Sequence, residues 1–230
     1  MHVGLIPDGN RRFMAKKHIE NLLNSYDLGI GKFYDFLKWC HDLGVNEVTI
    51  YALSLENIQS RGETELNTLF NVFNKHALKG VTDKDLHERK IRINVCGDLD
   101  GLVTVSKNKE LASEMVSNLR KLVSATSQYT NFIVNLAIAY GGRQEILYAA
   151  KKIVAAGEEL TEENLSKNLW VPSNPDLLIR TSEARISNFM LWQLAYSEIY
   201  FVDKLWQEFD KKDLEDIISD FKSRDRRFGK

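Results

Sequence analysis

The chain has 230 residues and a mass of 26.5 kDa, which suits one α/β domain of ordinary size. Its 43% apolar and 27% charged residues are close to globular averages and exclude a disordered chain, a collagen and a coiled coil. The 31 Lys and Arg residues balance 32 Asp and Glu residues, so the chain lacks the basic excess of a nucleic-acid-binding protein. Any anionic ligand must therefore be bound by a local cluster of basic side chains.

The cysteine content and hydropathy indicate the compartment. Cys40 and Cys96 show neither a disulfide pattern nor zinc spacing, which fits a reducing environment. An apolar strand follows Met1 without a signal-peptide pattern, and the most apolar window, Phe132–Tyr140, is far shorter than the ~20 residues that span a bilayer. We therefore expect a cytoplasmic protein with no transmembrane segment, whose membrane contact would be peripheral and through a lipid.

Short β-rich segments alternate with longer segments of helical periodicity, and no linker-like composition interrupts residues 1–230, so we predict a single domain. Gly44 and Gly157 are predicted to end two of the helices. Strands are predicted at His2–Ile6, Glu47–Leu53, Ile91–Cys96, Asn131–Ala139, Asp176–Thr181 and Ile199–Val202. Helices are predicted at Leu28–Leu43, Glu65–Leu78, Lys109–Ser124, Arg143–Ala156 and Asp210–Asp225. This order predicts an α/β fold with a mainly parallel sheet covered by helices.

In such a sheet, ligands bind beyond the carboxyl ends of the strands. Asp8-Gly9-Asn10-Arg11-Arg12 follows the first strand and opens a helix. Gly9 would let backbone amides approach an anion, and the two arginines would add donors for phosphate. Asp8 fits beside a phosphate if Mg²⁺ lies between them. The alternative is an ordinary Asp-Gly turn with two solvated arginines.

Three further strand ends carry polar residues. The segment Ser54–Asn57, with Arg61 beyond it, is either a ligand loop or a polar loop that caps the next helix. Tyr140–Arg143 is either a site segment or a tight glycine turn. Arg180–Ser187 supplies two arginines and a hydroxyl that could hold a diphosphate, with surface ion pairing to Glu183 as the alternative. Together these segments describe two phosphate sites that share one metal.

Other chemistries lack their motifs. The chain has no GxGxxG after its first strand, no P-loop, no HExxH and no Gly-x-Ser-x-Gly, and its five histidines show no metal-ligand spacing. The basic ending, residues 224–230, is by itself typical of a solvated tail.

The ordered set of strand ends resembles the cis-prenyltransferase family of the undecaprenyl diphosphate synthase type, from His2 to Gly229. The matching segments are HVGLIPDGNRRF, YALSLEN, NLAIAYGGRQEI, LLIRTSEARISNFMLWQLAYSEIYF and RDRRFG. The resemblance implies a six-stranded, mainly parallel sheet surrounded by helices, with an apolar tunnel, and a homodimer. It also implies an Mg²⁺-dependent condensation of an allylic isoprenoid diphosphate with isopentenyl diphosphate.

The resemblance assigns roles to individual residues. Metal binding would fall to Asp8 and Glu198, and catalysis to Asp8, Arg12 and Asn57. The allylic diphosphate would be held by Gly9, Asn10, Arg11, Arg12 and Phe13, with Ser54 and Arg61 as further substrate-binding residues. The isopentenyl diphosphate would be held by Arg180, Arg185 and Ser187. The terminal Arg227 and Gly229 would reach the site of the partner subunit.

The chain departs from the family pattern at the donor site. Arg11 stands where members usually have glycine, and Leu22 and Tyr26 stand where they have arginine and histidine. One phosphate contact is therefore expected to have moved to Arg11. Similar changes occur in lavandulyl and cyclolavandulyl diphosphate synthases, so non-head-to-tail condensation with dimethylallyl diphosphate as acceptor is an alternative. A subunit of a heteromeric enzyme is another, although the retained Asp8 and Arg12 disfavour a non-catalytic chain.

Three aromatic residues bear on product length. By resemblance, Phe132 lies on the strand at the closed end of the tunnel, and Phe70 and Phe73 lie on the facing helix with near-turn spacing. If their rings form a floor, the product is a short- or medium-chain prenyl diphosphate. The alternative is that all three are ordinary core aromatics.

Overall fold

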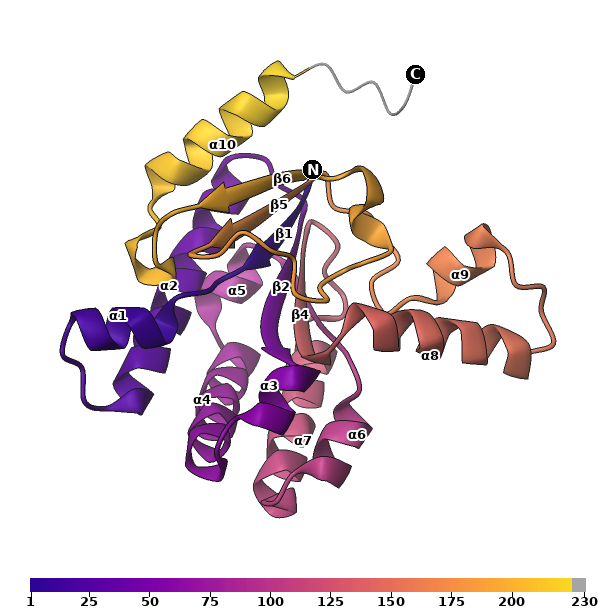
Figure 1. Cartoon of the computed structure of the whole chain (residues 1–230), viewed down its shortest axis with the longest axis horizontal. Coiled ribbons are helices and arrows are strands. Elements are labelled where there is room, and N and C mark those ends of the chain that lie inside the picture. The colour runs from indigo at the N-terminus through magenta and orange to yellow at the C-terminus, as the bar shows by residue number, and fades with distance from the viewer. Residues whose placement is uncertain (225–230) are drawn as a thin grey trace.

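A computed structural model describes residues 1–224 of the chain (Figure 1). Its centre is one six-stranded sheet in the order β3-β4-β2-β1-β5-β6, and every pair of neighbouring strands is parallel. The strands are β1 His2–Ile6, β2 Glu47–Ser54, β3 Ile91–Cys96, β4 Phe132–Tyr140, β5 Leu177–Thr181 and β6 Glu198–Val202. The predicted fold class is confirmed, and all six strands begin and end within one residue of their predicted limits.

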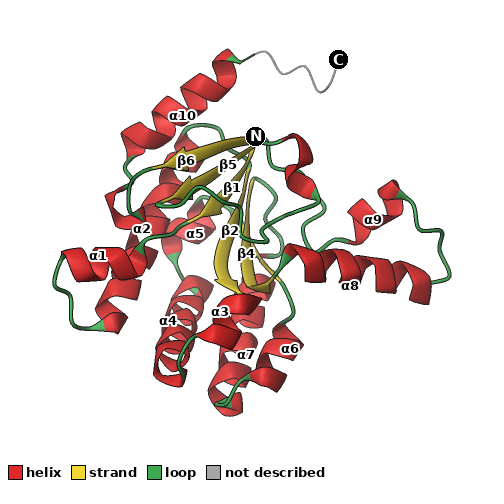
Figure 2. Ribbon diagram, in the orientation of Figure 1, coloured by secondary structure: helices red, strands yellow, loops and turns green. Residues whose placement is uncertain are grey.

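Helices cover the two faces of the sheet unequally (Figure 2). On one face α2 and α4 pack together, and α7 packs against α4 and β3. The other face carries a second apolar cluster, which includes Tyr140, Trp170 and Phe189. Helices α8 and α9 pack on each other and extend away from the sheet (Figure 1). The helices are α1 Asn10–Lys16, α2 Leu22–Asp42, α3 Leu55–Ser60, α4 Glu63–Val81, α5 Lys84–Glu88, α6 Leu99–Val105, α7 Lys109–Thr126, α8 Gly142–Ala155, α9 Glu162–Asn168 and α10 Lys211–Ser223.

Helix limits follow from side-chain capping. Asn21 accepts hydrogen bonds from two backbone amides of the first turn of α2, which lets that helix begin six residues before its predicted start. Ser54 caps α3 in the same way, so the segment that the sequence presents as a polar loop is a short helix. Gly44 and Gly157 follow α2 and α8 with φ of +77° and +69°, as predicted for residues that end a helix.

The apolar core lies mainly between the sheet and the layer of α2, α4 and α7. Cys40 and Cys96 are both buried and free, as predicted. Within residues 1–224, no helix is long and apolar enough to cross a bilayer.

Candidate active site

The site is built where β1 and β5 end side by side. Ile6 of β1 is in register with Arg180 of β5, and Asp8 follows two residues after Ile6. Arg180 Nη2 donates to Asp8 Oδ2 at 2.8 Å, and only 3% of the arginine side chain is exposed. A buried guanidinium is stable only with a close anionic partner. Asp8 and Arg180, predicted in separate phosphate sites, therefore form one unit.

The backbone around Asp8 is held firmly. The Thr181 hydroxyl donates to the Asp8 carbonyl at 2.8 Å and accepts from the Asp8 amide at 2.9 Å, and the Gly9 amide donates to Asp8 Oδ1 at 2.7 Å. Gly9 has a φ of +107°, and a Cβ at this position would lie 2.6 Å from Ser182 Oγ. Glycine is therefore required here, and the Asp8 carboxylate is pre-oriented.

Arg12 and Arg185 meet at a carboxylate between them. Arg12 Nη2 lies 3.0 Å from Glu183 Oε1, and Arg185 Nη1 donates to Glu183 Oε2 at 2.8 Å. Arg12 Nη1 also donates to the carbonyl of Ser182 at 3.1 Å. The ion pairing of Arg185 with Glu183 that the sequence allowed is therefore present, and it brings Arg185 close to Arg12.

Arg180 also organises the loop that follows β5. Its Nη1 donates to Ser187 Oγ at 2.7 Å and to the carbonyl of Arg185. Both Arg185 and Ser187 line the same cavity as Asp8. The structure thus brings together the three residues predicted to bind the second diphosphate.

A second polar cluster joins α1, α2 and α4. Arg11 donates to both oxygens of Glu65, at 2.9 and 2.8 Å, and Tyr26 Oη donates to Glu65 Oε1 at 2.7 Å. Arg61 Nη1 donates to Tyr26 Oη at 3.1 Å. Arg11 and Tyr26, whose residue types both depart from the family pattern, therefore share one carboxylate.

Burial and hydrogen bonding oppose each other in this cluster. Burial favours a raised pKa for Glu65, but the hydrogen bonds from Tyr26 and Arg11 outweigh it and hold that pKa below its ordinary value. Burial raises the pKa of Tyr26 to about 12, although the Arg61 charge opposes the shift. Glu65 is therefore an anion and Tyr26 a neutral donor at physiological pH.

The remaining predicted donor-site residues divide into two groups. Ser54 Oγ accepts from the Asn57 amide at 3.0 Å, and both residues line the cavity. Asn10 also lines it, and its Oδ1 accepts from Gln207 Nε2 at 2.5 Å. Phe13 is partly buried on α1 but does not line the cavity, because it lies one residue beyond Arg12 on the turning helix. Its role as a substrate contact stays a prediction.

A cavity of about 1270 Å³ begins at these polar residues and continues between α2, α4 and the sheet. Five arginines stand at or near its mouth, against four carboxylates: Asp8, Glu65 and Glu183, which pair with them, and Glu56, which also lines the cavity. This excess of positive charge suits an anionic ligand. The body of the cavity is apolar and is lined by Ile30, Phe33, Leu37, Ile50, Leu69, Val72, Phe73, Ala77, Ile91, Ile93, Leu119, Leu122 and Leu136.

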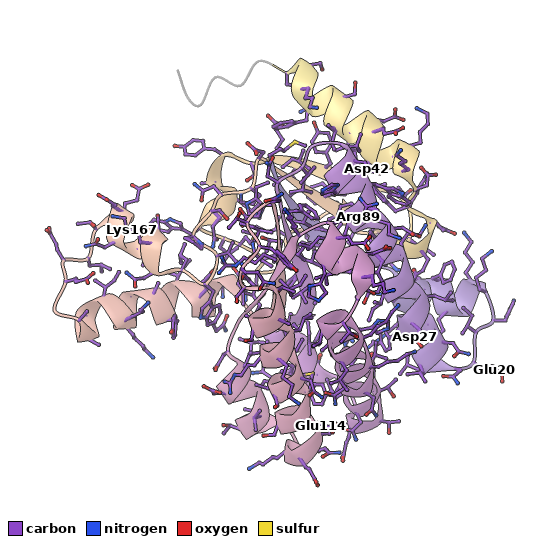
Figure 3. The ribbon with its side chains drawn as sticks, turned by 180° about the vertical axis from the view of Figure 1, so that it is seen from behind. Glu20, Asp27, Asp42, Arg89, Glu114 and Lys167 are labelled. Carbon is purple, nitrogen blue, oxygen red and sulfur yellow. The ribbon has the colours of Figure 1, made fainter. Side chains whose placement is uncertain are left out.

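Polar pairs border the cavity along its length. Asp27, labelled on α2 in Figure 3, accepts from Lys75 at 2.6 Å and contacts His76 at 3.1 Å, which ties α2 to α4. At the other end of α2, Arg89 lines the cavity and donates to Asp42 at 3.3 Å (Figure 3). The apolar body therefore extends from the mouth to a charged far end.

Two of the three predicted tunnel residues do not line this cavity. Phe132 is fully buried at the amino end of β4, where its ring packs 5.8 Å from the His41 ring of α2. Phe70 lies on the face of α4 that meets α7, because Asn74, one turn later, accepts a hydrogen bond from Asn118 of α7 at 3.0 Å. Neither side chain is part of the cavity wall, so their role as a tunnel floor stays a prediction, whereas Phe73 does line the cavity.

The remaining predicted residues lie away from this edge. Glu198 is the first residue of β6 and pairs in register with Leu177, at the amino edge of the sheet, where it accepts from Arg224 at 2.9 Å. Within one chain it does not share a site with Asp8. Arg227 and Gly229 lie outside the described residues.

Asp8 is the predicted metal ligand that lies at this edge of the sheet. Among residues 1–224 no group of three or more His, Cys, Asp and Glu side chains could hold a metal ion by itself. Asp8 offers a carboxylate that is 36% exposed and lines the cavity. Because Mg²⁺ is commonly bound by one or two carboxylates plus substrate phosphates, this donor set fits an ion that is completed by a diphosphate.

Two site residues escaped the sequence predictions. Glu65, which the sequence presents only as the start of a predicted helix, accepts from or pairs with two arginines and Tyr26. Asn188 follows Ser187 directly, lines the cavity and forms hydrogen bonds with α3 and with the start of α8. Its position inside the Arg-Ile-Ser-Asn-Phe core was a usable signal.

Comparison with known proteins places this site in a family. The family model described as "Putative undecaprenyl diphosphate synthase" matches residues 6–229. The chain is 42% identical, over 240 residues, to a tritrans,polycis-undecaprenyl-diphosphate synthase (geranylgeranyl-diphosphate specific) of Pyrococcus horikoshii, covering 100% of this chain and 86% of that protein. It is 36% identical over 233 residues to an isoprenyl transferase of Neisseria meningitidis, covering 100% and 89% of the two chains.

Two solved structures are similar over the whole chain. A probable undecaprenyl diphosphate synthase from Campylobacter jejuni has a TM-score of 0.79 at 29% identity, with 100% of this chain and 98% of that chain covered. The lavandulyl diphosphate synthase from Lavandula x intermedia, solved with dimethylallyl diphosphate, has a TM-score of 0.85 at 28% identity and the same coverage. The chain therefore belongs to the undecaprenyl diphosphate synthase family and is a prenyltransferase of the cis type.

Proposed function

We propose that the protein is an Mg²⁺-dependent cis-prenyltransferase that joins an allylic diphosphate to isopentenyl diphosphate and elongates its own product. The observation that carries this proposal is the cavity: Asp8 and a cluster of arginines stand at its mouth, and about 1270 Å³ of mainly apolar space lies behind them. Such a space matches substrates that have a diphosphate head and a hydrocarbon tail. The net charge of the mouth supports two anionic heads.

Asp8 would hold the metal together with oxygens of the allylic diphosphate. When bound, Mg²⁺ supplies positive charge that stabilises the departing diphosphate. Arg12 lies 3.9 Å from the Asp8 carboxylate and can donate to the same leaving group. Preorganised donors aimed at developing charge are a major source of catalysis.

Arg180 would link the two substrate sites. One side of its guanidinium holds Asp8 and the other holds Ser187, whose neighbour in the cavity is Arg185. The positions of the donor and acceptor heads are thereby set relative to each other, which favours attack of the alkene on the allylic carbon. Asn57 lines the same mouth and would orient the acceptor for proton loss, while the apolar cavity keeps water from the cation.

The donor and the product length follow from the relatives and from the cavity. The Pyrococcus horikoshii relative is named as specific for geranylgeranyl diphosphate and as an undecaprenyl diphosphate synthase. The expectation of a short or medium product depended on Phe132, Phe70 and Phe73, and of these only Phe73 lines the cavity. We therefore propose geranylgeranyl diphosphate as the donor and a long polycis chain as the product.

A homodimer is part of the proposal. Strand β6 is an edge strand, and near it the apolar side chains of Tyr196, Ile199 and Phe201 are exposed. Exposed apolar side chains beside an unpaired strand edge are typical of a protein contact. A second copy of this chain is the expected partner, with a different subunit as the alternative.

One assay separates these possibilities. Purified protein with Mg²⁺ is given dimethylallyl, geranyl, farnesyl or geranylgeranyl diphosphate, each with and without labelled isopentenyl diphosphate. We expect incorporation of label, fastest with geranylgeranyl diphosphate, and cis double bonds by NMR. Product from dimethylallyl diphosphate alone would instead indicate non-head-to-tail condensation. Turnover that requires an added subunit, or a monomer by light scattering, would contradict the homodimer.

A further inference from the structure

The loop after β5 contains an unusual run of backbone conformations. Ser182, Ser187, Asn188 and Met190 have positive φ values of 70°, 46°, 61° and 43°, although none is glycine. Side-chain-bearing residues rarely adopt this region, and such strain persists only where surrounding contacts enforce it. Asparagine tolerates the region better than most residues. The contacts of Asn188 explain how the run is held.

Asn188 forms hydrogen bonds with two other segments at once. Its carbonyl accepts from the Gly142 amide at 2.6 Å, and its Oδ1 accepts from the Arg143 amide at 2.9 Å. Its Nδ2 donates to Glu56 Oε1 at 2.8 Å and to Gln144 Oε1 at 3.2 Å. One side chain therefore joins the loop after β5 to the start of α8 and to α3.

The glycine pair after β4 makes room for this junction. A Cβ on Gly141 would lie 2.8 Å from Asn188 Nδ2, and a Cβ on Gly142 would lie 3.1 Å from the Asn188 carbonyl oxygen. Gly141 has an extended backbone with a φ of −159°, which any residue can adopt. The pair is therefore needed for close approach of the loop and not for a tight turn.

We propose that Asn188 is a positioning residue for the acceptor diphosphate, an inference that rests on the proposed function. It holds Ser187 in its strained conformation beside Arg180, and through Glu56 it holds the helix that carries Asn57. Ser187 and Asn57, which both line the cavity mouth, are thereby kept at a constant separation. Loss of the junction should affect the acceptor more than the allylic donor.

The test uses variants that keep the backbone conformation. Asn188→Gly retains access to positive φ but removes the side chain, and it should raise the KM for isopentenyl diphosphate about tenfold, with the donor KM within about twofold. Asn108→Ala, which removes the cap of α7, is the control for general destabilisation and should leave both KM values unchanged. Equal changes in the two KM values for Asn188→Gly would overturn the proposal.

Exchanging the donor and the acceptor of the hydrogen bond between Asn188 and Glu56 gives a second test. Asn188→Asp places a carboxylate against Glu56 and should raise the acceptor KM at least as much, with partial relief at acid pH. Adding Glu56→Gln returns a donor to this pair and should recover most of the loss. A double variant no better than Asn188→Asp contradicts the positioning role.

Failure of this inference can be told from failure of the proposed function. A wild-type protein that never incorporates isopentenyl diphosphate would refute the function itself. An active wild type beside a folded Asn188→Gly variant with unchanged acceptor KM would refute only the role of Asn188. Circular dichroism at the assay temperature confirms that each variant is folded.

Discussion

The mouth and the body of the cavity are stabilised by different interactions. At the mouth, Arg180 is almost completely buried and is fixed by Asp8 and Ser187 at 2.8 and 2.7 Å. In the body, apolar side chains such as Leu37 and Phe73 form the cavity wall. Ion pairs and hydrogen bonds fix the orientation of the polar groups at the mouth, whereas dispersion contacts determine the shape of the cavity body. Substitutions at the mouth should therefore change rate and binding, and those in the body should change product length.

The mouth itself has a rigid side and an adjustable side. Arg180 is 3% exposed, and each of its two terminal nitrogens, Nη1 and Nη2, has a hydrogen-bond partner. Arg11 is 63% exposed and donates to the Glu65 carboxylate. A diphosphate can compete for an exposed arginine more easily than for a buried one, since less structure must rearrange. A substitution of Arg180 should therefore reduce the free energy of unfolding more than a substitution of Arg11.

The largest effect is expected at Asp8. Asp8→Asn keeps the size of the side chain and removes the charge that would bind the metal, so kcat should fall about 1000-fold, or roughly 4 kcal/mol of barrier. Steady-state kinetics at saturating Mg²⁺ measures the loss. Asp216→Asn, which alters an exposed carboxylate on α10, is the matched control. A decrease of less than about tenfold would show that Asp8 is not the metal ligand.

The next effects separate Arg180 from Arg185. Each Ala variant should raise the KM for isopentenyl diphosphate by about 10- to 100-fold, because one charge-assisted contact is lost. Arg180→Ala also leaves Asp8 without its buried partner and should reduce the free energy of unfolding by about 3 kcal/mol. Thermal unfolding should show that loss for Arg180→Ala and almost none for the exposed Arg185→Ala. A rise confined to the donor KM would refute the assignment of this loop to the acceptor.

A smaller effect is expected on the adjustable side. Arg11→Gly should raise the donor KM about fivefold, since a single exposed contact is worth about 1 kcal/mol. Adding Leu22→Arg and Tyr26→His should restore part of the binding, because these changes return the family's basic residues to α2. A mutant cycle measures the coupling as non-additivity. Strictly additive losses would mean that Arg11 does not replace a contact from α2.

In the body of the cavity, rate should change least. Phe73→Ala enlarges the cavity and should shift the products toward longer chains, with kcat within about threefold. Phe132→Ala should leave the chain lengths unchanged but cost about 3–4 kcal/mol of stability, because this fully buried ring does not line the cavity. Chromatography of the products decides between them. A length change with Phe132→Ala alone would place the floor at β4 after all.

Much of the site could be predicted because parallel strands bring their carboxyl ends to one edge. Asp8 and Arg180 are 172 residues apart, yet each follows or ends a strand, so their meeting follows from topology. That they pair directly could not be predicted, because pairing depends on the register of β1 with β5 and on the burial of Arg180. Glu198 lies at the opposite edge of the sheet, because it begins its strand instead of ending it.

The cavity was harder to predict than the mouth. Helical spacing shows that Phe70 and Phe73 are neighbours, but a step of three residues falls short of a full turn, so Phe70 lies against α7 while Phe73 lines the cavity. For Phe132, alternation along the strand predicts the correct face of the sheet, but it does not show how far along the strand the cavity reaches. The role of Asn188 depends on the loop after β5 packing onto a glycine pair more than 40 residues earlier, which no local pattern encodes.

The most direct test of the account is a crystal structure of the protein with Mg²⁺, isopentenyl diphosphate and a thiolo analogue of geranylgeranyl diphosphate that resists ionisation. The account predicts the metal about 2.1 Å from an Asp8 oxygen, the acceptor diphosphate on Arg185 and Ser187, and the hydrocarbon in the cavity beside Phe73. A metal or allylic diphosphate bound away from Asp8, or a hydrocarbon outside the cavity, would contradict it.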